Sequence, residues 1–229
     1  MNTNNEKAVT KKVLIFDLDG TLYQLRGGSY AKSPLKRRVG ENAEKFIAKK
    51  LSIEQSYAKC ILNLVRDKYV EDISIGLERE FGIDRYEYFN AVWDIRAAEV
   101  IKMTHDLHEI LRSLSQEYRL VLLSDAPRVW INNVLNHLKV TDIFGKNVFS
   151  GEGSRRKGFG TAFAAIIKRF RVAPEDCISI GDQEVTDIIP AKEAGMHTIL
   201  IHPKDHQTRA DLHVTSMRKL PRALKSLPK

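Results

Sequence analysis

Short apolar runs alternate along this chain with amphipathic segments, and this alternation limits the folds it can adopt. Continuous apolar runs of this kind are typical of parallel strands that are covered on both faces. Four such runs lie at 13–16 (VLIF), 120–123 (LVLL), 177–180 (CISI) and 198–201 (TILI). Apolar residues recur between them at helical spacing, as at Leu107, Leu111 and Leu114. Strands that alternate with helices predict right-handed βαβ units and an α/β fold with a Rossmann-like, doubly wound parallel sheet.

Weaker signals extend the same pattern. Further strands are expected at 147–149 and 210–214. Further helices are expected at 131–138, at 163–170, in the segment between Asp187 and Gly195, and at 220–227. Gly195 is a natural C-cap for the third of these helices, because glycine adopts the left-handed conformation that often ends a helix.

The stretch from 24 to 103 breaks the alternation, because it contains no convincing strand and several helix signals. Residues 52–55 have the form of a capping box that would begin a helix at Ser52, and Asp84 and Glu87 form a similar start. We therefore expect a flexible N-terminus at 1–11, a Rossmann-like core at 12–23 and 104–229, and an all-helical cap domain at 24–103.

Composition excludes several classes of protein. Among 229 residues there are two cysteines, without the CxxC spacing of a metal or redox motif, so a reducing compartment is expected. No window resembles a signal peptide or a membrane span, which favours a cytoplasmic protein. Five of the eight net positive charges lie between Lys204 and Lys229, where no aromatic residue occurs. We interpret this stretch as a solvated basic C-terminus, and nucleic acid is not the expected partner.

Polar residues follow several of the predicted strands. Ligands bind beyond the carboxyl ends of strands in open parallel sheets. The residues at these ends are Asp17 and Asp19, then Ser124 and Asp125, then Lys157 in a basic turn, and finally Asp182 and Asp187. Four strand ends thus deliver carboxylates, a hydroxyl and an ammonium group to one edge of the sheet.

Carboxylates crowded at this edge would repel one another unless a cation neutralised them. A site of carboxylates, water and a substrate phosphate is typical of Mg²⁺. Zinc is not expected, because the histidines lack paired spacing beyond His105 and His108. A carboxylate nucleophile can split the very slow hydrolysis of a phosphate ester into two steps through an aspartyl-phosphate. The metal and a lysine would balance charge on the transferred group.

These residues resemble the motifs of the haloacid dehalogenase superfamily, in its phosphatase branch. The motifs occur in order as 17–21 (DLDGT), the strand ending in Ser124, Lys157 before a core helix, and 181–187 (GDQEVTD). The resemblance implies that Asp17 is the nucleophile and a metal ligand. It implies that Asp19 is the general acid and base, with its backbone carbonyl on the metal.

The resemblance also assigns the remaining site residues. Ser124 and Lys157 would bind the substrate phosphate, Asp182 would ligate Mg²⁺, and Asp187 would orient the metal shell. Dehalogenases of this superfamily lack the second aspartate, so Asp19 favours phosphoryl chemistry, and Thr21 favours a hydrolase over a mutase. The helical insert is similar to the cap of phosphoglycolate phosphatase-like members, with a weaker likeness to pyrimidine 5'-nucleotidases.

Alternative interpretations remain for single residues and for the whole chain. Ser124 and Asp187 could simply cap helices, and Lys157 could belong to a basic surface run with its neighbours. Asp125 stands where the family often has asparagine, and it would hinder phosphate binding unless it points away or meets the metal. The expected function is a Mg²⁺-dependent phosphatase for a small phosphorylated metabolite. The alternatives are a 5'-nucleotidase or a non-catalytic binding protein that retains the fold.

Overall fold

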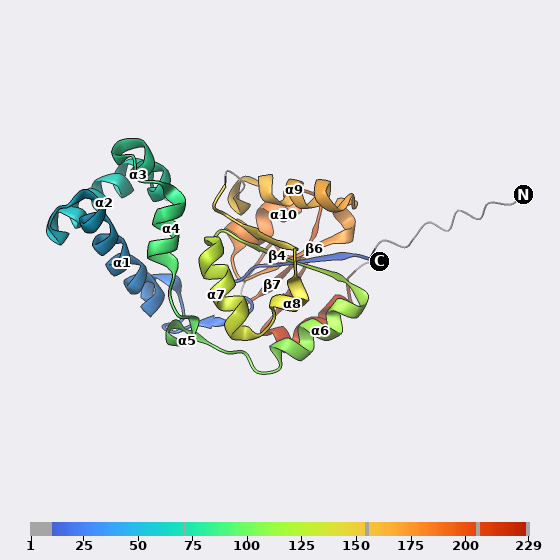
Figure 1. Ribbon diagram of the computed structural model, residues 1–229. Helices are drawn as coiled ribbons and strands as arrows, with labels where there is room; N and C mark the ends of the chain where they lie inside the picture. The colour runs from blue at the N-terminus through green and yellow to red at the C-terminus, as the bar shows by residue number, and fades with distance from the viewer. Residues whose placement is uncertain (1–10, 71, 154–155, 205–206, 228–229) are drawn as a thin grey trace, which may run out of the picture.

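The computed structural model describes residues 11–70, 72–153, 156–204 and 207–227. Within them, a six-stranded parallel sheet has the order β5-β4-β1-β6-β7-β8. Its strands are β1 (Val13–Phe16), β4 (Arg119–Ser124), β5 (Val148–Ser150), β6 (Cys177–Gly181), β7 (His197–Ile201) and β8 (Leu212–Val214). The expected doubly wound parallel sheet is confirmed (Figure 1). The predicted flexible N-terminus falls, apart from residue 11, outside the described residues.

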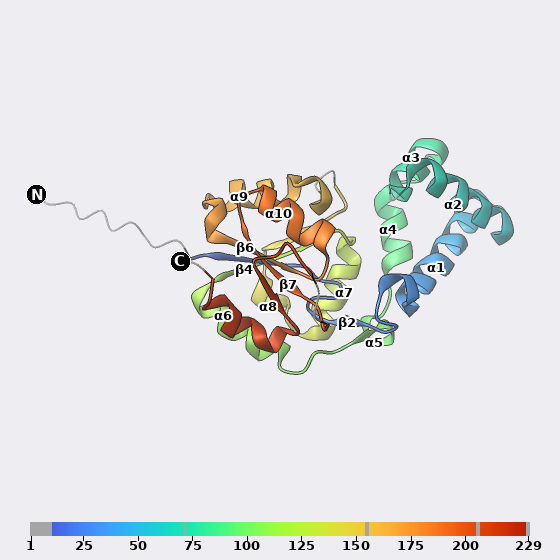
Figure 2. The same cartoon turned by 180° about the vertical axis from the view of Figure 1, so that it is seen from behind.

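Helices cover both faces of the sheet, as the alternating pattern predicts (Figures 1 and 2). One face bears α6 (Leu107–Glu117), α7 (Arg128–Leu138), α8 (Thr141–Phe144) and α11 (Leu220–Leu224). The other bears α9 (Thr161–Phe170) and α10 (Ile189–Glu193). Successive side chains of a strand point to opposite faces. Accordingly Leu14 and Phe16 of β1 pack under α6, α7, α8 and α11, in what we call the first core. Val13 and Ile15 pack under α9 and α10, in the second core.

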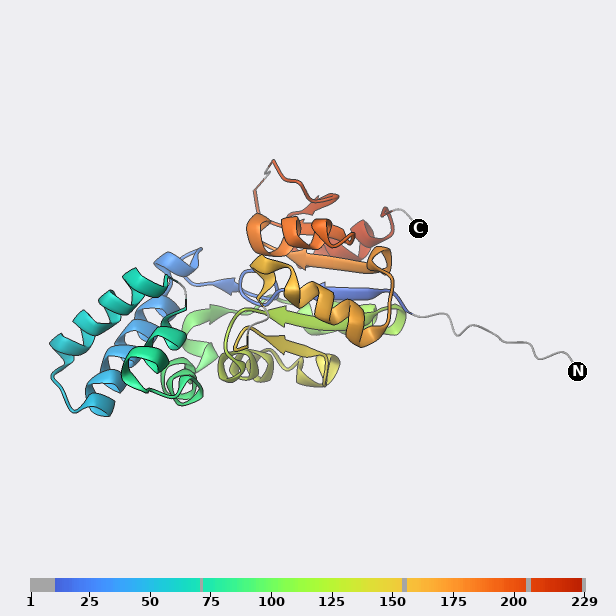
Figure 3. The ribbon, with the colours of Figure 1, turned by 90° about the horizontal axis from the view of Figure 1, so that it is seen from above.

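A helical insertion interrupts the core after β1 (Figure 3). It runs from β2 (Gln24–Leu25) to β3 (Ile101–Lys102), and these two strands pair with each other in antiparallel fashion. Between them lie η1 (Tyr30–Lys32), α1 (Pro34–Leu51), α2 (Gln55–Tyr69), α3 (Ile73–Phe81), α4 (Arg85–Trp93) and α5 (Ala97–Val100). Figure 3 shows the core strands pointing toward this insertion. The domain bounds at 23/24 and 103/104 stay a prediction.

Two details of the insertion differ from the sequence prediction. No strand was expected there, yet the insertion contains β2 and β3. Each is only two residues long, which is too short to leave an alternating signal in the sequence. Ser52 does not begin a helix: it ends α1 in the left-handed conformation, with φ 53° and ψ 47°, and Glu54 precedes α2 instead. The predicted start at Asp84 is confirmed, because its side chain accepts a hydrogen bond from the Glu87 backbone N–H at 2.7 Å.

The basic C-terminal stretch also contributes to the core. Strand β8 extends the sheet, and Leu220 and Leu224 of α11 are buried in the first core. Arg218 stays largely exposed and forms an ion pair with Asp106 at 2.6 Å. The charged residues Arg218, Lys219 and Arg222 therefore lie on packed helical segments. Among the described helices, we find none with the length and apolar character needed to span a membrane.

Candidate active site

The carboxyl ends of β1, β4 and β6 bring the predicted site residues together. Phe16 at the end of β1 lies opposite Leu122 of β4 and Ile180 of β6. The pairing continues one residue further, because the Asp17 N–H donates to the Ile180 carbonyl at 2.9 Å. Asp17 is thus fixed by the backbone of the adjacent strand, next to the turn that carries Asp182.

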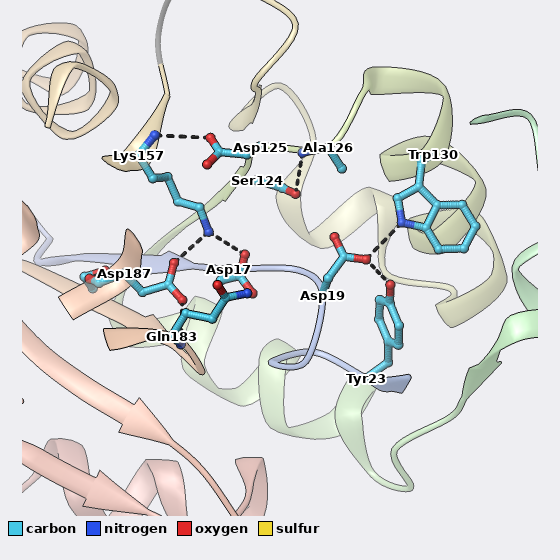
Figure 4. Close-up of polar contacts among 11 residues, drawn as sticks. Asp17, Asp19, Tyr23, Ser124, Asp125, Ala126, Trp130, Lys157, Gln183 and Asp187 are labelled. Atoms are coloured by element: carbon cyan, nitrogen blue, oxygen red, sulfur yellow. Dashed lines mark hydrogen bonds and ion pairs between the residues drawn. The ribbon is translucent and has the colours of Figure 1, made fainter. Parts of the chain in front are cut away.

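Lys157 lies in the middle of the carboxylate group (Figure 4). Its Nζ donates to Asp17 Oδ1 at 2.7 Å and to Asp187 Oδ1 at 2.6 Å. Lys157 is 5% exposed, Asp17 6% and Asp187 1%. Burial would lower the pKa of Lys157, but the two carboxylates outweigh this effect and raise its pKa above the ordinary value. Lys157 therefore keeps its positive charge at the centre of the site.

Three carboxylates at this edge could hold a cation. Oxygen atoms of Asp17, Asp182 and Asp187 lie within 4.8 Å of one another. Among the described residues, Asp17 Oδ2 and Asp182 Oδ1 are buried and have no hydrogen-bond partner. A buried carboxylate oxygen without a partner is costly, whereas a hard divalent cation would satisfy both atoms. The triad is therefore consistent with a divalent metal site, and His105 and His108 lie outside it.

The electrostatics of the aspartates support the same interpretation. Burial, opposed by Lys157, raises the pKa of Asp17 well above its ordinary value, and the charges of Asp187, Asp182 and Asp19 add to the rise. Burial and the charge of Asp187 also raise the pKa of Asp182, to about 7. A bound cation favours the ionised form of its ligands. The metal would thus restore the ionised state that a nucleophilic Asp17 needs.

Two glycines allow the carboxylates to come this close. Gly20 adopts a positive φ of 96°, and a Cβ there would lie 2.2 Å from Asp182 Oδ2. A Cβ on Gly181 would lie 2.2 Å from Asp187 Oδ2. Any larger residue at either position would displace a carboxylate of the candidate metal site.

One carboxylate oxygen of Asp19, Oδ1, faces two aromatic side chains (Figure 4). It accepts hydrogen bonds from the Tyr23 hydroxyl and from Trp130 Nε1, the latter at 3.0 Å. Burial raises the pKa of Asp19, although the hydrogen bonds from Tyr23 and Trp130 oppose the rise. Trp130 could not be predicted as a site residue, because its contact with Asp19 joins residues 111 positions apart and leaves no local pattern in the sequence.

Ser124, at the end of β4, is 1% exposed and does not cap α7. Its Oγ accepts a hydrogen bond from the Ala126 N–H at 3.1 Å, and Pro127 occupies the N-cap position. The neighbouring Asp125 accepts a hydrogen bond from the Lys157 backbone N–H at 3.1 Å. The carboxylate of Asp125 is thus directed to the loop that carries Lys157, where it helps to fix that loop.

Asp187 lies in η4 (Glu184–Ile188), a single wide turn between β6 and α10. Its Oδ2 accepts a hydrogen bond from the Gln183 N–H at 3.0 Å, and its backbone carbonyl accepts one from the Ser179 hydroxyl at 2.8 Å. The side chain therefore binds both the first residues of this turn and Lys157. Asp187 does not cap α10, whose N-cap position is occupied by Ile188 without a side-chain hydrogen bond, so the capping interpretation is wrong.

Comparison with known proteins gives the family. A family model described as haloacid dehalogenase-like hydrolase matches residues 11–195, which is most of the chain. The protein therefore belongs to the haloacid dehalogenase-like hydrolases. The resemblance found in the ordered sequence motifs is confirmed.

Relatives that match over most of the chain are phosphatases. The N-acylneuraminate-9-phosphatase of Rattus norvegicus is 26% identical, over 94% of each chain. The phosphoglycolate phosphatase of Colwellia psychrerythraea is 22% identical, over 84% of this chain and 85% of its own. A HAD phosphatase structure from Thermococcus onnurineus superposes with a TM-score of 0.65 at 20% identity, covering 93% of this chain and 97% of its own. This last likeness supports the fold, including the core and its helical insertion.

Proposed function

We propose that the protein is a Mg²⁺-dependent phosphatase that hydrolyses a small phosphate monoester through an aspartyl-phosphate on Asp17. The observation that carries the proposal is the contact of buried Lys157 with Asp17, beside the unpartnered oxygens of Asp17 and Asp182. A nucleophile, a fixed positive charge and a cation site thus lie within one small volume. Phosphoryl transfer through an aspartyl-phosphate uses these three components.

The donor set favours Mg²⁺ over softer metals, because every ligand is an oxygen. Asp17, the backbone carbonyl of Asp19 and Asp182 would hold the ion, and Asp187 would orient its surroundings through the backbone of Gln183. When bound, Mg²⁺ supplies positive charge that stabilises the transferring phosphoryl group and keeps the carboxylates ionised. Lys157 and Ser124 bind the non-bridging phosphate oxygens from beyond the carboxyl ends of the neighbouring strands β5 and β4.

In the first step an oxygen of Asp17 attacks phosphorus, and the bond between phosphorus and the ester oxygen breaks. Asp19 gives its proton to the departing oxygen, which leaves as an alcohol. The raised pKa of buried Asp19 favours the protonated form that this step needs. Lys157 holds its charge beside the attacked group, where negative charge accumulates.

In the second step Asp19, now a carboxylate, takes a proton from water. The water oxygen attacks phosphorus, the bond between phosphorus and Asp17 breaks, and inorganic phosphate is released. Asp19 is again protonated and Asp17 again ionised, so the cycle closes without a further reactant. Both proton transfers thus use the Asp19 side chain, first as acid and then as base.

The substrate is proposed only as a small phosphorylated metabolite, and the protein is proposed to be cytoplasmic. Relatives with the names N-acylneuraminate-9-phosphatase, glyceraldehyde 3-phosphate phosphatase and phosphoglycolate phosphatase suggest the first compounds to compare. Nucleoside monophosphates belong in the same panel, because a 5'-nucleotidase is the alternative activity. Relative kcat/KM values with Mg²⁺ would rank these substrates.

The direct test is hydrolysis of p-nitrophenyl phosphate with Mg²⁺ and with EDTA. We expect turnover that depends on Mg²⁺ and that falls at least ~10³-fold in Asp17→Asn, because the amide is a poor nucleophile. No turnover by the wild type would favour the non-catalytic binding protein. Undiminished turnover in Asp17→Asn would show that another group attacks phosphorus.

A further inference from the structure

The carboxylate of Asp19 accepts hydrogen bonds from two buried aromatic side chains. Trp130 on α7 and Tyr23, four residues after Asp19, both donate to Oδ1 (Figure 4). Both aromatic residues are 0% exposed. The Tyr23 hydroxyl is the donor in this contact.

Two donors on one carboxylate oxygen determine where a proton can reside. An indole N–H can only donate, so a proton on Oδ1 would face the Trp130 N–H, and the Tyr23 hydroxyl already donates to the same oxygen. Oδ1 therefore accepts twice, and a proton on the carboxyl group resides on Oδ2. The two bonds also restrict rotation of the side chain, because turning the carboxyl group would leave two buried donors without an acceptor.

We propose that Tyr23 and Trp130 are positioning residues that hold Asp19 so that its Oδ2 presents the proton to the leaving group. This inference rests on the proposed function, in which Asp19 is the general acid. Neither aromatic residue contacts Asp17 or Lys157 through a hydrogen bond in the described structure, so each acts through Asp19. Tyr23 belongs to the first motif loop, and Trp130 to the helix after the second, so the two bonds also tie these segments together.

A purely structural role is the alternative, because buried Tyr and Trp donors need an acceptor in any protein. The two roles predict different kinetics. Loss of positioning weakens proton donation, and this loss matters most when the departing oxygen is strongly basic. Loss of packing alone lowers the rate for all substrates to the same extent.

The test compares kcat/KM for p-nitrophenyl phosphate, a good leaving group, with that for phenyl phosphate, a poor one. In Tyr23→Phe and in Trp130→Phe we expect kcat/KM for phenyl phosphate to fall about tenfold to a hundredfold. For p-nitrophenyl phosphate we expect a fall of less than about threefold. The double variant should lose little more than the single ones, because both act on one oxygen.

Tyr88→Phe is the matched control, because it removes a hydroxyl from a tyrosine that is 5% exposed in the core of the insertion. It should leave both rates unchanged. Tyr23→Phe keeps the shape of the ring, and thermal unfolding checks that each variant folds. Equal losses for both substrates, or no loss, would overturn the positioning role. A wild type without turnover would instead contradict the proposed function itself.

Discussion

Lys157 carries a positive charge in an almost fully buried position, between two carboxylates that are also buried. Removing one partner of a buried ion pair is far more costly than the pair itself is worth, because the other partner then has an uncompensated charge. Lys157 faces two such partners, Asp17 and Asp187. At the residue scale, this contact should therefore dominate the stability of the metal-free site.

We predict that Lys157→Met lowers the free energy of unfolding of the metal-free protein by about 3–5 kcal/mol. Urea denaturation at pH 8 in EDTA measures this quantity. Lys68→Met is the control, because Lys68 forms an exposed pair with Glu80 at 2.7 Å and should matter much less. If the free energy of unfolding fell by the same small amount in both variants, Lys157 would not be compensating the charges of Asp17 and Asp187.

The raised pKa of Asp182 predicts how stability depends on pH. Its pKa is about 7 in the folded metal-free protein, against an ordinary value of 3.8. Between these values the folded protein binds a proton that the unfolded chain has lost, so the free energy of unfolding falls as pH rises from about 4 to about 7. The raised pKa of Asp17 acts in the same direction. The slope from one group is at most about 1.4 kcal/mol per pH unit.

Denaturation of the EDTA-treated protein at several pH values measures this slope. Asp182→Asn should flatten it, because the amide does not titrate. Saturating Mg²⁺ should also flatten it, because the ion favours the ionised carboxylates. A slope that Asp182→Asn leaves unchanged would contradict the effect of burial and of neighbouring carboxylates inferred for Asp182.

At the scale of elements, helix α7 donates an N-terminal backbone hydrogen bond to a distant loop. Glu152, after β5, accepts a hydrogen bond from the Arg128 N–H at 2.8 Å, while Arg128 Nη2 donates to the Val148 carbonyl at 3.0 Å. Carboxylates are favourable at helix N-termini, where backbone N–H groups lack partners. Glu152 thus couples the loop before Lys157 to the helix that carries Trp130.

We predict that Glu152→Ala destabilises the protein by about 1 kcal/mol, the usual cost of a lost helix cap. Chemical denaturation at neutral pH measures the change. Glu117→Ala, an exposed glutamate at the end of α6, should change stability by no more than about 0.5 kcal/mol. A null effect of Glu152→Ala would mean that water replaces its contact without cost.

The elements of the core could be predicted because their signals are local. Each strand is a compact apolar run, and the ends of parallel strands necessarily meet at one edge, which places Asp17, Ser124 and Asp182 together. Non-local features could not be predicted. The bonds from Trp130 to Asp19 and from Lys157 to Asp125 depend on how loops return to the sheet. The helix start predicted at Ser52 is wrong because α1 continues to Leu51, so Ser52 is the C-cap of α1.

At the scale of the molecule, the insertion has a core of its own, yet its base belongs to the main core. Leu25, Leu35 and Ile95 pack in the same cluster as Trp130 and Ile131 of α7. Polar contacts join the same parts: Asn133 Nδ2 donates to Asp94 Oδ1 at 2.9 Å and to the Ile95 carbonyl at 3.2 Å. The base of the insertion thus packs against α7, which carries Trp130, the partner of Asp19.

A second contact joins the insertion to the opposite side of the site. Arg156 Nη2 lies 2.7 Å from Asp72 Oδ1, and Arg156 immediately precedes Lys157. The partly exposed position of this pair limits its contribution to stability. Asp72 is the N-cap residue of α3, so this pair links α3 to the loop that carries Lys157.

The covalent intermediate on Asp17 is the central claim, and chemical trapping tests it most directly. The enzyme is quenched during turnover, reduced with borohydride and digested, and the peptides are identified by mass spectrometry. Reduction converts an aspartyl-phosphate to homoserine, so we predict homoserine at position 17, only with substrate and Mg²⁺, and none in Asp17→Asn. Turnover without any reduced residue, or reduction at another carboxylate such as Asp19, would contradict Asp17 as the nucleophile.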